Sequence, residues 1–341
     1  MRLPTYIYLA KLSLQTRKHI RDLFLITINI PIMAKIYNSF YYAQIRKKSL
    51  NGLRGMEIEG YNTCNLRCVM CPYQNMTREK TLMNMDLFKK IIDDAVDSGI
   101  KEIGLNFYNE PFMDPLIFER INYVKSKGIR TVLNSNGTLM GKERMENVLR
   151  SSVDTIIFSF DAATKGTYEG IRVGANFEKT RNNIVNLIKE RNKMAIKKPN
   201  VIINFATQKN NYNEIKAFKT FWKDIADGVN ISEVDNRRID GLLPDELKTR
   251  VIKRRLYPCR RIFQVMNVMS NGKVALCCRD FDGTVILGDL NKQTIAEIYN
   301  SPGWKRLRLL HFNANGDKVK LCHDIQCPDL FRDGAYSWIV V

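Results

Sequence analysis

One short loop reads Cys64-Asn65-Leu66-Arg67-Cys68-Val69-Met70-Cys71 and is followed by Pro72. Its three cysteines can converge on one cluster, because cysteine thiolates are the usual ligands of iron–sulfur clusters. A cubane cluster takes four such ligands, so one iron would have no protein ligand here, and an open coordination position is typical of a reactive metal site. A structural zinc site would show paired C-x2-C or histidine-containing knuckles, and a ferredoxin run has other spacings and a fourth cysteine. The loop therefore predicts a cluster with one open iron.

Strand and helix patterns alternate from about residue 55 to residue 235, which predicts an α/β fold with a parallel sheet. The predicted strands are 56–61, 103–107, 129–134, 155–160, 201–206 and 229–234, and the predicted helices are 85–98, 116–127, 142–151, 177–193 and 213–227. The cysteine loop leaves the carboxyl end of the first strand, and parallel α/β architectures bind ligands at that edge of the sheet.

The C-x3-C-x2-C spacing directly after a first strand resembles the signature of the radical S-adenosylmethionine (radical SAM) superfamily. The resemblance implies a partial (β/α)6 TIM-like barrel and a 4Fe-4S cluster held by Cys64, Cys68 and Cys71. It further implies that SAM binds the open iron and is cleaved reductively to a 5′-deoxyadenosyl radical, which abstracts hydrogen from a substrate. An electron donor such as flavodoxin or ferredoxin would be needed. Met70 departs from the aromatic residue often found before the last cysteine, but a flexible thioether can pack in the same place.

Glu110 follows the second predicted strand. Its position corresponds to the acid in the G-G-E-P motif of the family. The resemblance implies a charge-assisted hydrogen bond between Glu110 and the amino group of SAM. Tyr108 and Asn109 replace the two glycines of the motif, so the backbone cannot approach SAM in quite the same way. Glu110 could alternatively be a turn residue before proline.

Three further segments resemble SAM-binding motifs of the family in the same order. Asn134 and Asn136 lie in a stretch similar to the T-N-G-T turn, whose polar side chains reach the SAM carboxylate or ribose, although Asn-Gly is also a common turn dipeptide. Ser159 matches the serine of the S-x-D motif that borders the SAM site. Arg172 ends a Y-x-x-I-R segment and could clamp the SAM carboxylate with both arms of its guanidinium group.

A second set of thiols follows in the last hundred residues: Cys259, Cys277, Cys278, Cys322 and Cys327. With the segment 272–277, they resemble the auxiliary-cluster module called SPASM, or its shorter twitch form. A two-cluster pattern needs more cysteines, so the resemblance implies one auxiliary 4Fe-4S cluster on Cys259, Cys277, Cys322 and Cys327. The C-x4-C spacing of the last pair is unusual for the module, which leaves His323 as a minor alternative ligand. A structural zinc on the same four cysteines also remains open.

Asp280 lies close to these ligands and, by analogy with relatives, is a candidate base that deprotonates a substrate radical. The alternative is that Asp280 caps a turn before Asp282-Gly283.

The chain has 341 residues, which suits one large domain and a smaller one. We expect a basic, helical N-terminal extension over residues 1–54, the barrel over 55–240 and the small cysteine-rich cluster-binding domain over 241–341. Eight cysteines without a recognisable signal peptide predict a reducing compartment, and hence a cytoplasmic location.

The formal net charge is +19, and residues 1–54 carry ten Lys or Arg residues against one acid, Asp22. Such a segment could contact anionic lipid or a phosphorylated substrate, and no motif specific for nucleic acid accompanies it. A solvated basic face and an amphipathic helix on a membrane surface are both open interpretations, and the apolar stretch 23–36 is too short to span a bilayer.

The resemblance implies a radical SAM enzyme that oxidises a small substrate, with the auxiliary cluster as electron acceptor. Similarity to relatives of this size implies a sugar or an aminocyclitol, and the basic excess favours a phosphorylated, nucleotide-linked or lipid-linked sugar. Two alternatives remain: a radical SAM maturase of a peptide or protein side chain, and a non-enzymatic iron–sulfur electron carrier or redox sensor.

Overall fold

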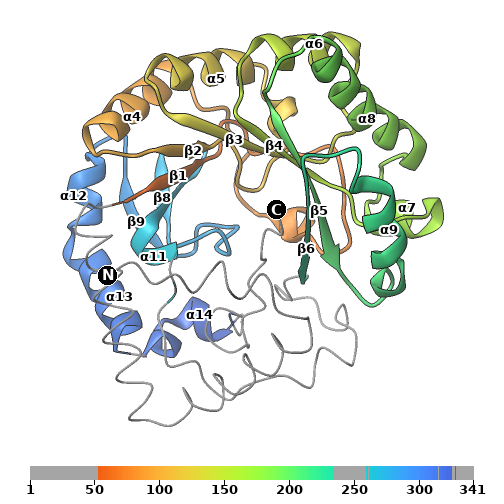
Figure 1. Cartoon of the computed structure of the whole chain (residues 1–341). Coiled ribbons are helices and arrows are strands. Elements are labelled where there is room, and N and C mark those ends of the chain that lie inside the picture. Colours follow the sequence, from red (N-terminus) through yellow and green to blue (C-terminus); the bar gives the residue numbers. More distant parts are fainter. Residues whose placement is uncertain (1–52, 234–258, 260, 314, 325–326, 328–341) are drawn as a thin grey trace, which may run out of the picture.

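The computed structural model of the protein describes residues 53–233, 259, 261–313, 315–324 and 327 (Figure 1). The predicted basic extension therefore lies almost entirely outside the described residues, and so does the predicted boundary at residue 240. One nine-stranded sheet runs through the described part in the order β6-β5-β4-β3-β2-β1-β7-β8-β9. It remains open between β6 and β9, as expected for a partial barrel.

Six strands alternate with helices in the first part of the sheet, as the sequence predicts. The strands are β1 (Gly55–Ile58), β2 (Glu102–Gly104), β3 (Arg130–Ser135), β4 (Thr155–Ser159), β5 (Asn200–Thr207) and β6 (Gly228–Glu233). The helices are α4 (Met85–Asp97), α5 (Ile117–Ser126), α6 (Lys142–Arg150), α7 (Lys165–Ile171), α8 (Phe177–Lys193) and α9 (Ile215–Trp222). All neighbouring strands in this group are parallel.

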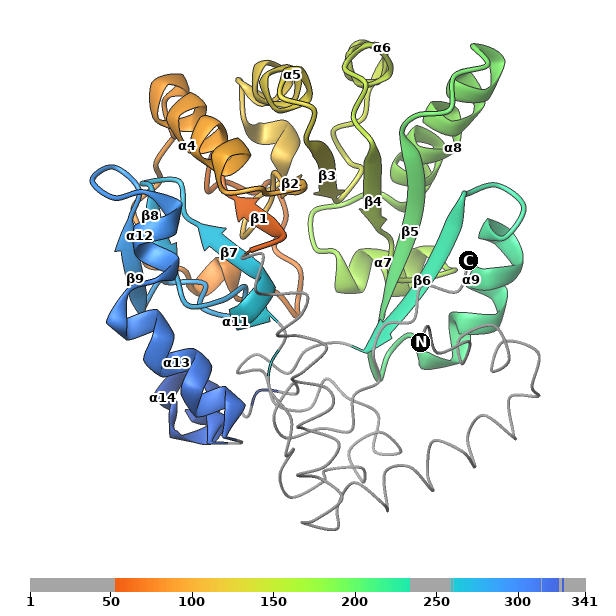
Figure 2. The same cartoon turned by 60° about the vertical axis from the view of Figure 1, so that its left-hand side comes forward.

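Helices α4, α5, α6 and α8 cover the outer side of the curved sheet (Figures 1 and 2). Helix α4 shows why: its buried residues recur at helical spacing and end in Ile91, Ile92 and Ala95. Its N-terminus is capped by Asn84, whose side chain accepts a hydrogen bond from the Leu87 amide. The alternating burial of β5 places Val201, Ile203 and Phe205 against the helices and turns Asn204 and Ala206 to the inner side.

Helix α7 is the element of this part that the sequence analysis missed. It is short and contains Gly166 and Gly170, which are poor helix formers, so its pattern gives little local signal. The predicted helix 213–227 is also shorter in the structure, where α9 ends at Trp222.

The C-terminal part continues the same sheet. Strand β7 (Val265–Val268) pairs in parallel with β1, and β8 (Lys273–Ala275) and β9 (Ile286–Asp289) add antiparallel strands beyond it. Within the described residues the α-helices of this part are α11 (Arg261–Gln264), α12 (Ile295–Tyr299), α13 (Pro302–Phe312) and α14 (Lys320–Asp324). The second cysteine region is therefore joined directly to the first strand of the barrel, next to the loop that carries the first cysteines (Figure 2).

None of the helices in the described ranges combines the length and the apolar character that a membrane span requires.

Candidate functional site

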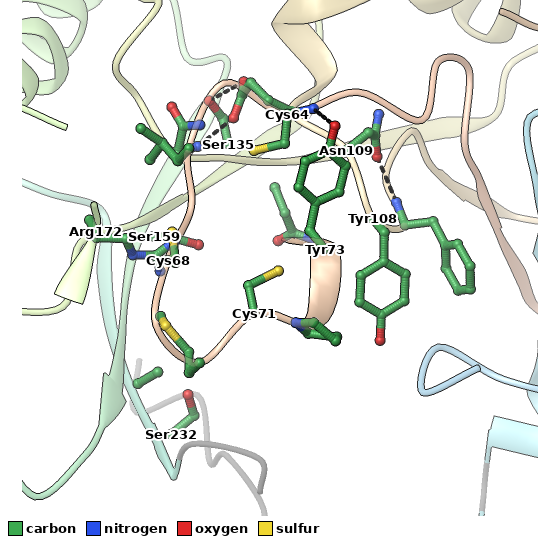
Figure 3. A pocket seen from close by; sticks show the side chains of 18 residues that line it. Cys64, Cys68, Cys71, Tyr73, Tyr108, Asn109, Ser135, Ser159, Arg172 and Ser232 are labelled. Carbon is green, nitrogen blue, oxygen red and sulfur yellow. Dashed lines mark hydrogen bonds between the residues drawn. The ribbon is translucent and has the colours of Figure 1, made fainter. Parts of the chain in front are cut away.

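A cavity of about 350 Å³ lies at the carboxyl ends of the parallel strands, beside the cysteine loop (Figure 3). Cys64, Cys68 and Cys71 line it from one segment. The predicted SAM-binding residues line it from four others, namely Glu110, Asn134, Asn136, Ser159 and Arg172. The structure therefore brings all eight of these predicted site residues to one cavity.

Backbone hydrogen bonds dock the cysteine loop on the end of α7. The amides of Arg67 and Val69 donate to the carbonyl oxygens of Val173 and Ile171, each at 3.0 Å. The two donors are the neighbours of Cys68 in sequence, and the two acceptors are the neighbours of Arg172. The loop is thus held by segments that lie about a hundred residues further along the chain.

Tyr73 supports the first cysteine of the loop. Its hydroxyl oxygen accepts a hydrogen bond of 3.0 Å from the amide of Cys64, and its ring lines the cavity (Figure 3). Burial raises the pKa of the Cys64 thiol to about 12. A thiolate at this position therefore needs a nearby positive charge of the kind that bound iron supplies, which fits the role of a cluster ligand.

Glu110 is 2% exposed and is held in place by three donors. Its carboxylate accepts hydrogen bonds from the Ser135 hydroxyl at 2.8 Å, the Asn136 amide at 2.7 Å and the Phe112 amide at 3.3 Å. Burial raises the pKa of Glu110 to about 7, although the hydrogen bonds oppose that shift. The acid is therefore orientated at the cavity wall, and Ser135, to which the sequence analysis gave no role, helps to orientate it.

Asn134 and Asn136 differ in their surroundings. The Asn136 side chain is occupied within the protein: its Nδ2 donates to Asn65 in the cysteine loop at 2.9 Å, and its Oδ1 accepts from the Thr138 amide at 2.9 Å. Asn134 is exposed at the end of β3, and its side chain faces the cavity without a hydrogen bond to another described residue. The Asn136 side chain thus links the turn after β3 to the cysteine loop, whereas the Asn134 side chain can contact a ligand.

Arg172 lies between a carboxylate and a cysteine. Its Nε and Nη2 are each 2.6 Å from Oδ2 of the fully buried Asp161, and its Nη1 is 3.6 Å from Sγ of Cys68. Burial of the guanidinium disfavours its charge, but Asp161 and the Cys68 thiol hold the pKa of Arg172 above its usual range. Ser159 borders the same side of the cavity (Figure 3).

The second set of thiols also gathers in space. Cys259, Cys277, Cys322 and Cys327 all belong to the same hydrophobic cluster. Burial raises the pKa of the Cys277 thiol well above its ordinary value, and negative charge on the neighbouring sulfurs of Cys278, Cys259 and Cys322 would raise it further. Cys327 is attached to Cys322 through a hydrogen bond of 3.0 Å from its amide to the Cys322 carbonyl oxygen. Among the described residues, no three His, Cys, Asp or Glu side chains take the tight arrangement that a single metal ion needs.

His311 is a residue near these thiols that the sequence analysis missed. It is buried in α13, and its Nε2 lies 4.0 Å from Sγ of Cys322. Nothing in the local pattern of a basic helix distinguishes this histidine. His323, the minor alternative ligand, has a side chain that is 69% exposed beside Asp324.

Asp280 is buried and caps a turn. Its Oδ1 accepts hydrogen bonds from the amide and the hydroxyl of Thr284 at 2.7 and 2.8 Å, and its Oδ2 accepts from the Val285 amide at 2.9 Å. It is not among the residues that line the described cavity. The capping interpretation thus accounts for these contacts, and the role of Asp280 as a base stays a prediction.

A buried bridge connects the two cysteine regions. The Tyr108 hydroxyl donates to the carbonyl oxygen of Cys278 at 2.7 Å, and the Tyr108 ring lines the cavity (Figure 3). Beside it, Arg78 forms an ion pair with the buried Glu59 at 2.7 Å and donates to the carbonyl oxygen of Phe281 at 2.7 Å. These contacts connect the segments that follow β1, β2 and the cysteine loop with the turn after Cys278.

Comparisons with known families match both parts of the chain. A model described as the radical SAM superfamily matches residues 58–214, and one described as an iron–sulfur cluster-binding domain, SPASM, matches residues 259–328. The two matches contain the two cysteine sets.

Curated relatives match mostly over part of their length. The tungsten-containing aldehyde ferredoxin oxidoreductase cofactor-modifying protein of Pyrococcus furiosus is 29% identical over 197 residues, 56% of this chain and 52% of that protein. The AdoMet-dependent heme synthase of Methanosarcina barkeri is 32% identical over 119 residues, 34% of each chain. The chain thus spans about half or less of these relatives. The S-adenosyl-L-methionine-dependent 2-deoxy-scyllo-inosamine dehydrogenase of Niallia circulans is 18% identical over 294 residues, 84% of this chain and 97% of that protein.

Solved structures share the fold. BtrN in complex with AdoMet and 2-DOIA superimposes with a TM-score of 0.57 at 16% identity, over 84% of this chain and 98% of that one. Streptococcus suis SuiB bound to the precursor peptide SuiA gives a TM-score of 0.62 at 16% identity, over 80% and 71% of the two chains. At such identities the likeness shows the fold alone.

Proposed function

The chain belongs to the radical SAM superfamily and carries a C-terminal SPASM-type cluster domain, and from this premise we propose that it oxidises a small polar substrate by hydrogen abstraction. Membership implies a 4Fe-4S cluster with SAM, and the SPASM domain implies auxiliary iron–sulfur chemistry, as the sequence analysis expected. The observation that carries the proposal is that three thiols of one loop and five polar residues from four other segments line one cavity.

When bound, the cluster and SAM supply the one-electron cleavage of SAM that makes hydrogen abstraction from a substrate feasible. Cys64, Cys68 and Cys71 would hold that cluster, and Glu110 would accept a hydrogen bond from the amino group of SAM. Asn134 and Ser159 lie where they can orientate the rest of the ligand.

Aromatic side chains close the cavity on the side of the bridge. Tyr73, Phe107 and Tyr108 line it there, and Tyr108 packs edge-on against Phe281 with ring centroids 5.9 Å apart. On this side such a wall would limit the access of water to the reacting groups, which would reduce side reactions of a radical.

The auxiliary site would take one 4Fe-4S cluster on Cys259, Cys277, Cys322 and Cys327. Its nearness to the cavity wall through Tyr108 and Cys278 supports a role as electron acceptor in a net oxidation. A single zinc ion on the same thiols is less well supported, because the matching domain is an iron–sulfur domain.

The cavity lining supports a polar substrate without a phosphate group, such as a sugar or an aminocyclitol. Among the described lining residues the charged ones are Glu110, whose proposed partner is the amino group of SAM, and Arg172, which is ion-paired with Asp161. Uncharged amides and hydroxyls, such as Asn134, Ser159 and Ser232, make up much of the polar lining. The Niallia relative, whose name describes an aminocyclitol dehydrogenase and which aligns over nearly its whole length, supports the same class. The phosphorylated substrate that the net charge favoured finds no unpaired cation among these lining residues.

The other expectations remain proposals. A peptide maturase stays the alternative enzyme, and a membrane-surface contact would involve residues outside the described ranges. A flavodoxin or ferredoxin remains the expected electron donor.

The test compares two sets of cysteine variants after anaerobic reconstitution. In the Cys64→Ala/Cys68→Ala/Cys71→Ala variant we expect about half of the bound iron and all 5′-deoxyadenosine formation to be lost. In the Cys277→Ala/Cys322→Ala variant we expect about half of the iron to be lost while SAM is still cleaved in the presence of dithionite. Iron and sulfide assays with chromatographic detection of 5′-deoxyadenosine give the result.

SAM cleavage that survives in the first variant would refute the proposed site. Zinc in place of iron at the second set would refute the auxiliary cluster. Absence of SAM cleavage in the wild-type protein, even with candidate sugars added, would favour the electron-carrier alternative.

A further inference from the structure

We propose that the ion pair Asp161–Arg172 sets the reduction potential of the cluster at the cysteine loop, through a hydrogen bond from Arg172 to the Cys68 sulfur. The inference rests on the proposed cluster and concerns two residues of this chain. Arg172 thereby acts on a cluster ligand, in addition to any contact with SAM.

The backbone places the two side chains opposite each other. Amides on either side of Cys68 donate to carbonyl oxygens on either side of Arg172, at 3.0 Å in both cases. Cys68 and Arg172 therefore lie opposite each other, between two backbone hydrogen bonds. The Nη1 to Sγ distance of 3.6 Å is within the range of a hydrogen bond to sulfur, and Figure 3 shows Arg172 directly beside Cys68.

Asp161 determines which nitrogen is left for the sulfur. Its Oδ2 lies 2.6 Å from both Nε and Nη2 of Arg172, so that edge of the guanidinium is occupied. Its Oδ1 accepts a hydrogen bond of 2.7 Å from the Ala206 amide, which ties the carboxylate to the end of β5. Asp161 is completely buried, and the Arg172 side chain is 11% exposed. The guanidinium therefore has little freedom to turn Nη1 away from Cys68.

Charge and hydrogen bonding at the ligand sulfur control the potential of an iron–sulfur cluster. Reduction adds an electron, so a nearby positive charge and an N–H donor stabilise the reduced form and raise the potential. Arg172 supplies both, since guanidinium stays protonated in proteins. The carboxylate of Asp161 acts in the opposite direction because it offsets part of that positive charge. Removing the charge of each partner should therefore shift the potential with opposite signs.

The experiment is a potentiometric titration followed by electron paramagnetic resonance (EPR), on the signal that changes when SAM is added. Arg172→Gln is expected to lower the midpoint potential, and Asp161→Asn is expected to raise it. Asp161→Asn removes the charge with little change in volume, and its one oxygen can still accept from Arg172, at the loss of the hydrogen bond from the Ala206 amide. A merely structural role would not produce shifts of opposite sign.

The chain offers a matched control in a second buried aspartate–arginine pair. Asp114 and Arg120 are 2.7 Å apart and almost completely buried, and neither forms a hydrogen bond with a cysteine among the described residues. Asp114→Asn should reduce thermal stability and leave the midpoint potential unchanged. Should Arg172→Gln not retain its cluster, Arg172→Lys keeps the charge but loses the planar fork, and a smaller downward shift is expected.

Shifts of the same sign in the Asp161 and Arg172 variants, or no shift in Asp161→Asn, would overturn the inference. Its failure is distinguishable from failure of the proposed function, because the wild-type protein would still bind iron and give a SAM-sensitive signal.

Discussion

The two cysteine sets differ in how far apart their members lie in the sequence, although both are candidate ligands of an iron–sulfur cluster. Cys64, Cys68 and Cys71 lie within eight residues of one loop, whereas Cys259, Cys277, Cys322 and Cys327 are spread over almost seventy. The first set depends on a local loop that docks on α7 by two backbone hydrogen bonds. The second depends on strands, helices and a turn that must pack before the thiols can meet.

This difference suggests a different sensitivity to packing. A local loop needs few long-range contacts to bring its ligands together, because little chain entropy is lost in closing it. A dispersed set needs the whole C-terminal unit to be folded. Defects in the packing of that unit should therefore remove the second cluster and spare the first.

The largest effect is expected from Trp304→Ala. Trp304 is fully buried, donates from Nε1 to the Ile262 carbonyl oxygen at 2.8 Å, and so holds α13 against α11. Loss of this side chain should cost about 3–5 kcal/mol of unfolding free energy. We expect iron at the second site to fall while SAM binding is retained, as measured by thermal unfolding, iron assay and SAM titration.

Trp222 is the matched control on the barrel side. It is 1% exposed, lies in α9 and packs edge-on against Phe160 with ring centroids 5.6 Å apart. Trp222→Ala should cost a similar free energy but weaken SAM binding and leave the iron of the second site bound. If both variants lost the same site, the comparison between the two regions would not hold.

A smaller effect on the first region is expected from Glu110→Gln. Loss of one charge-assisted hydrogen bond, about 1.5–3 kcal/mol, should weaken SAM binding by roughly ten- to hundredfold. Because burial raises the pKa of Glu110 to about 7, the wild-type carboxyl ionises as the pH rises through 7. SAM affinity should therefore increase between about pH 6 and 8 in the wild type and not in the variant, which calorimetry at several pH values would measure.

Glu57→Gln provides the control for this pH profile. Burial raises the pKa of Glu57 to about 7 as well, but Glu57 is not among the residues that line the cavity. The pH dependence of SAM binding should persist in this variant. Its loss there would assign the titration to a residue other than Glu110.

The smallest effect is expected from Tyr108→Phe, which removes one hydrogen bond between the cavity wall and the second cysteine region. The hydroxyl donates to Cys278 at 2.7 Å, and its loss should cost about 0.5–1.5 kcal/mol. Amide hydrogen exchange in residues 277–283 should become up to about tenfold faster, with SAM affinity unchanged.

Tyr73→Phe removes a hydroxyl from the same aromatic cluster but on the side of the cysteine loop. It should affect the Cys64 amide and leave exchange in residues 277–283 as in the wild type. Equal exchange in the two variants would contradict a specific role for Tyr108 between the regions.

The predictable part of the molecule was local. Six strands and most helices followed from short periodic patterns, and Glu110 and Arg172 were found because each occupies a place in a short motif that resembles one of the family's. Strand β7 was missed because its partner, β1, lies some two hundred residues earlier. Ser135, His311 and the Glu59–Arg78 pair were missed for the same reason: their partners come from other elements, and their own neighbours in sequence say nothing of them.

By itself the sequence determined the chemistry that is available: three thiols in one loop, an acid and amides at strand ends, and a second set of cysteines. These features depend on residue type and short spacing, which a chain carries before it folds. Only the tertiary structure decided which groups meet: Arg172 with Asp161 and Cys68, and Tyr108 with Cys278. Burial shifts and charge pairing arise when distant segments exclude water together, so the properties that tune this site belong to the folded protein.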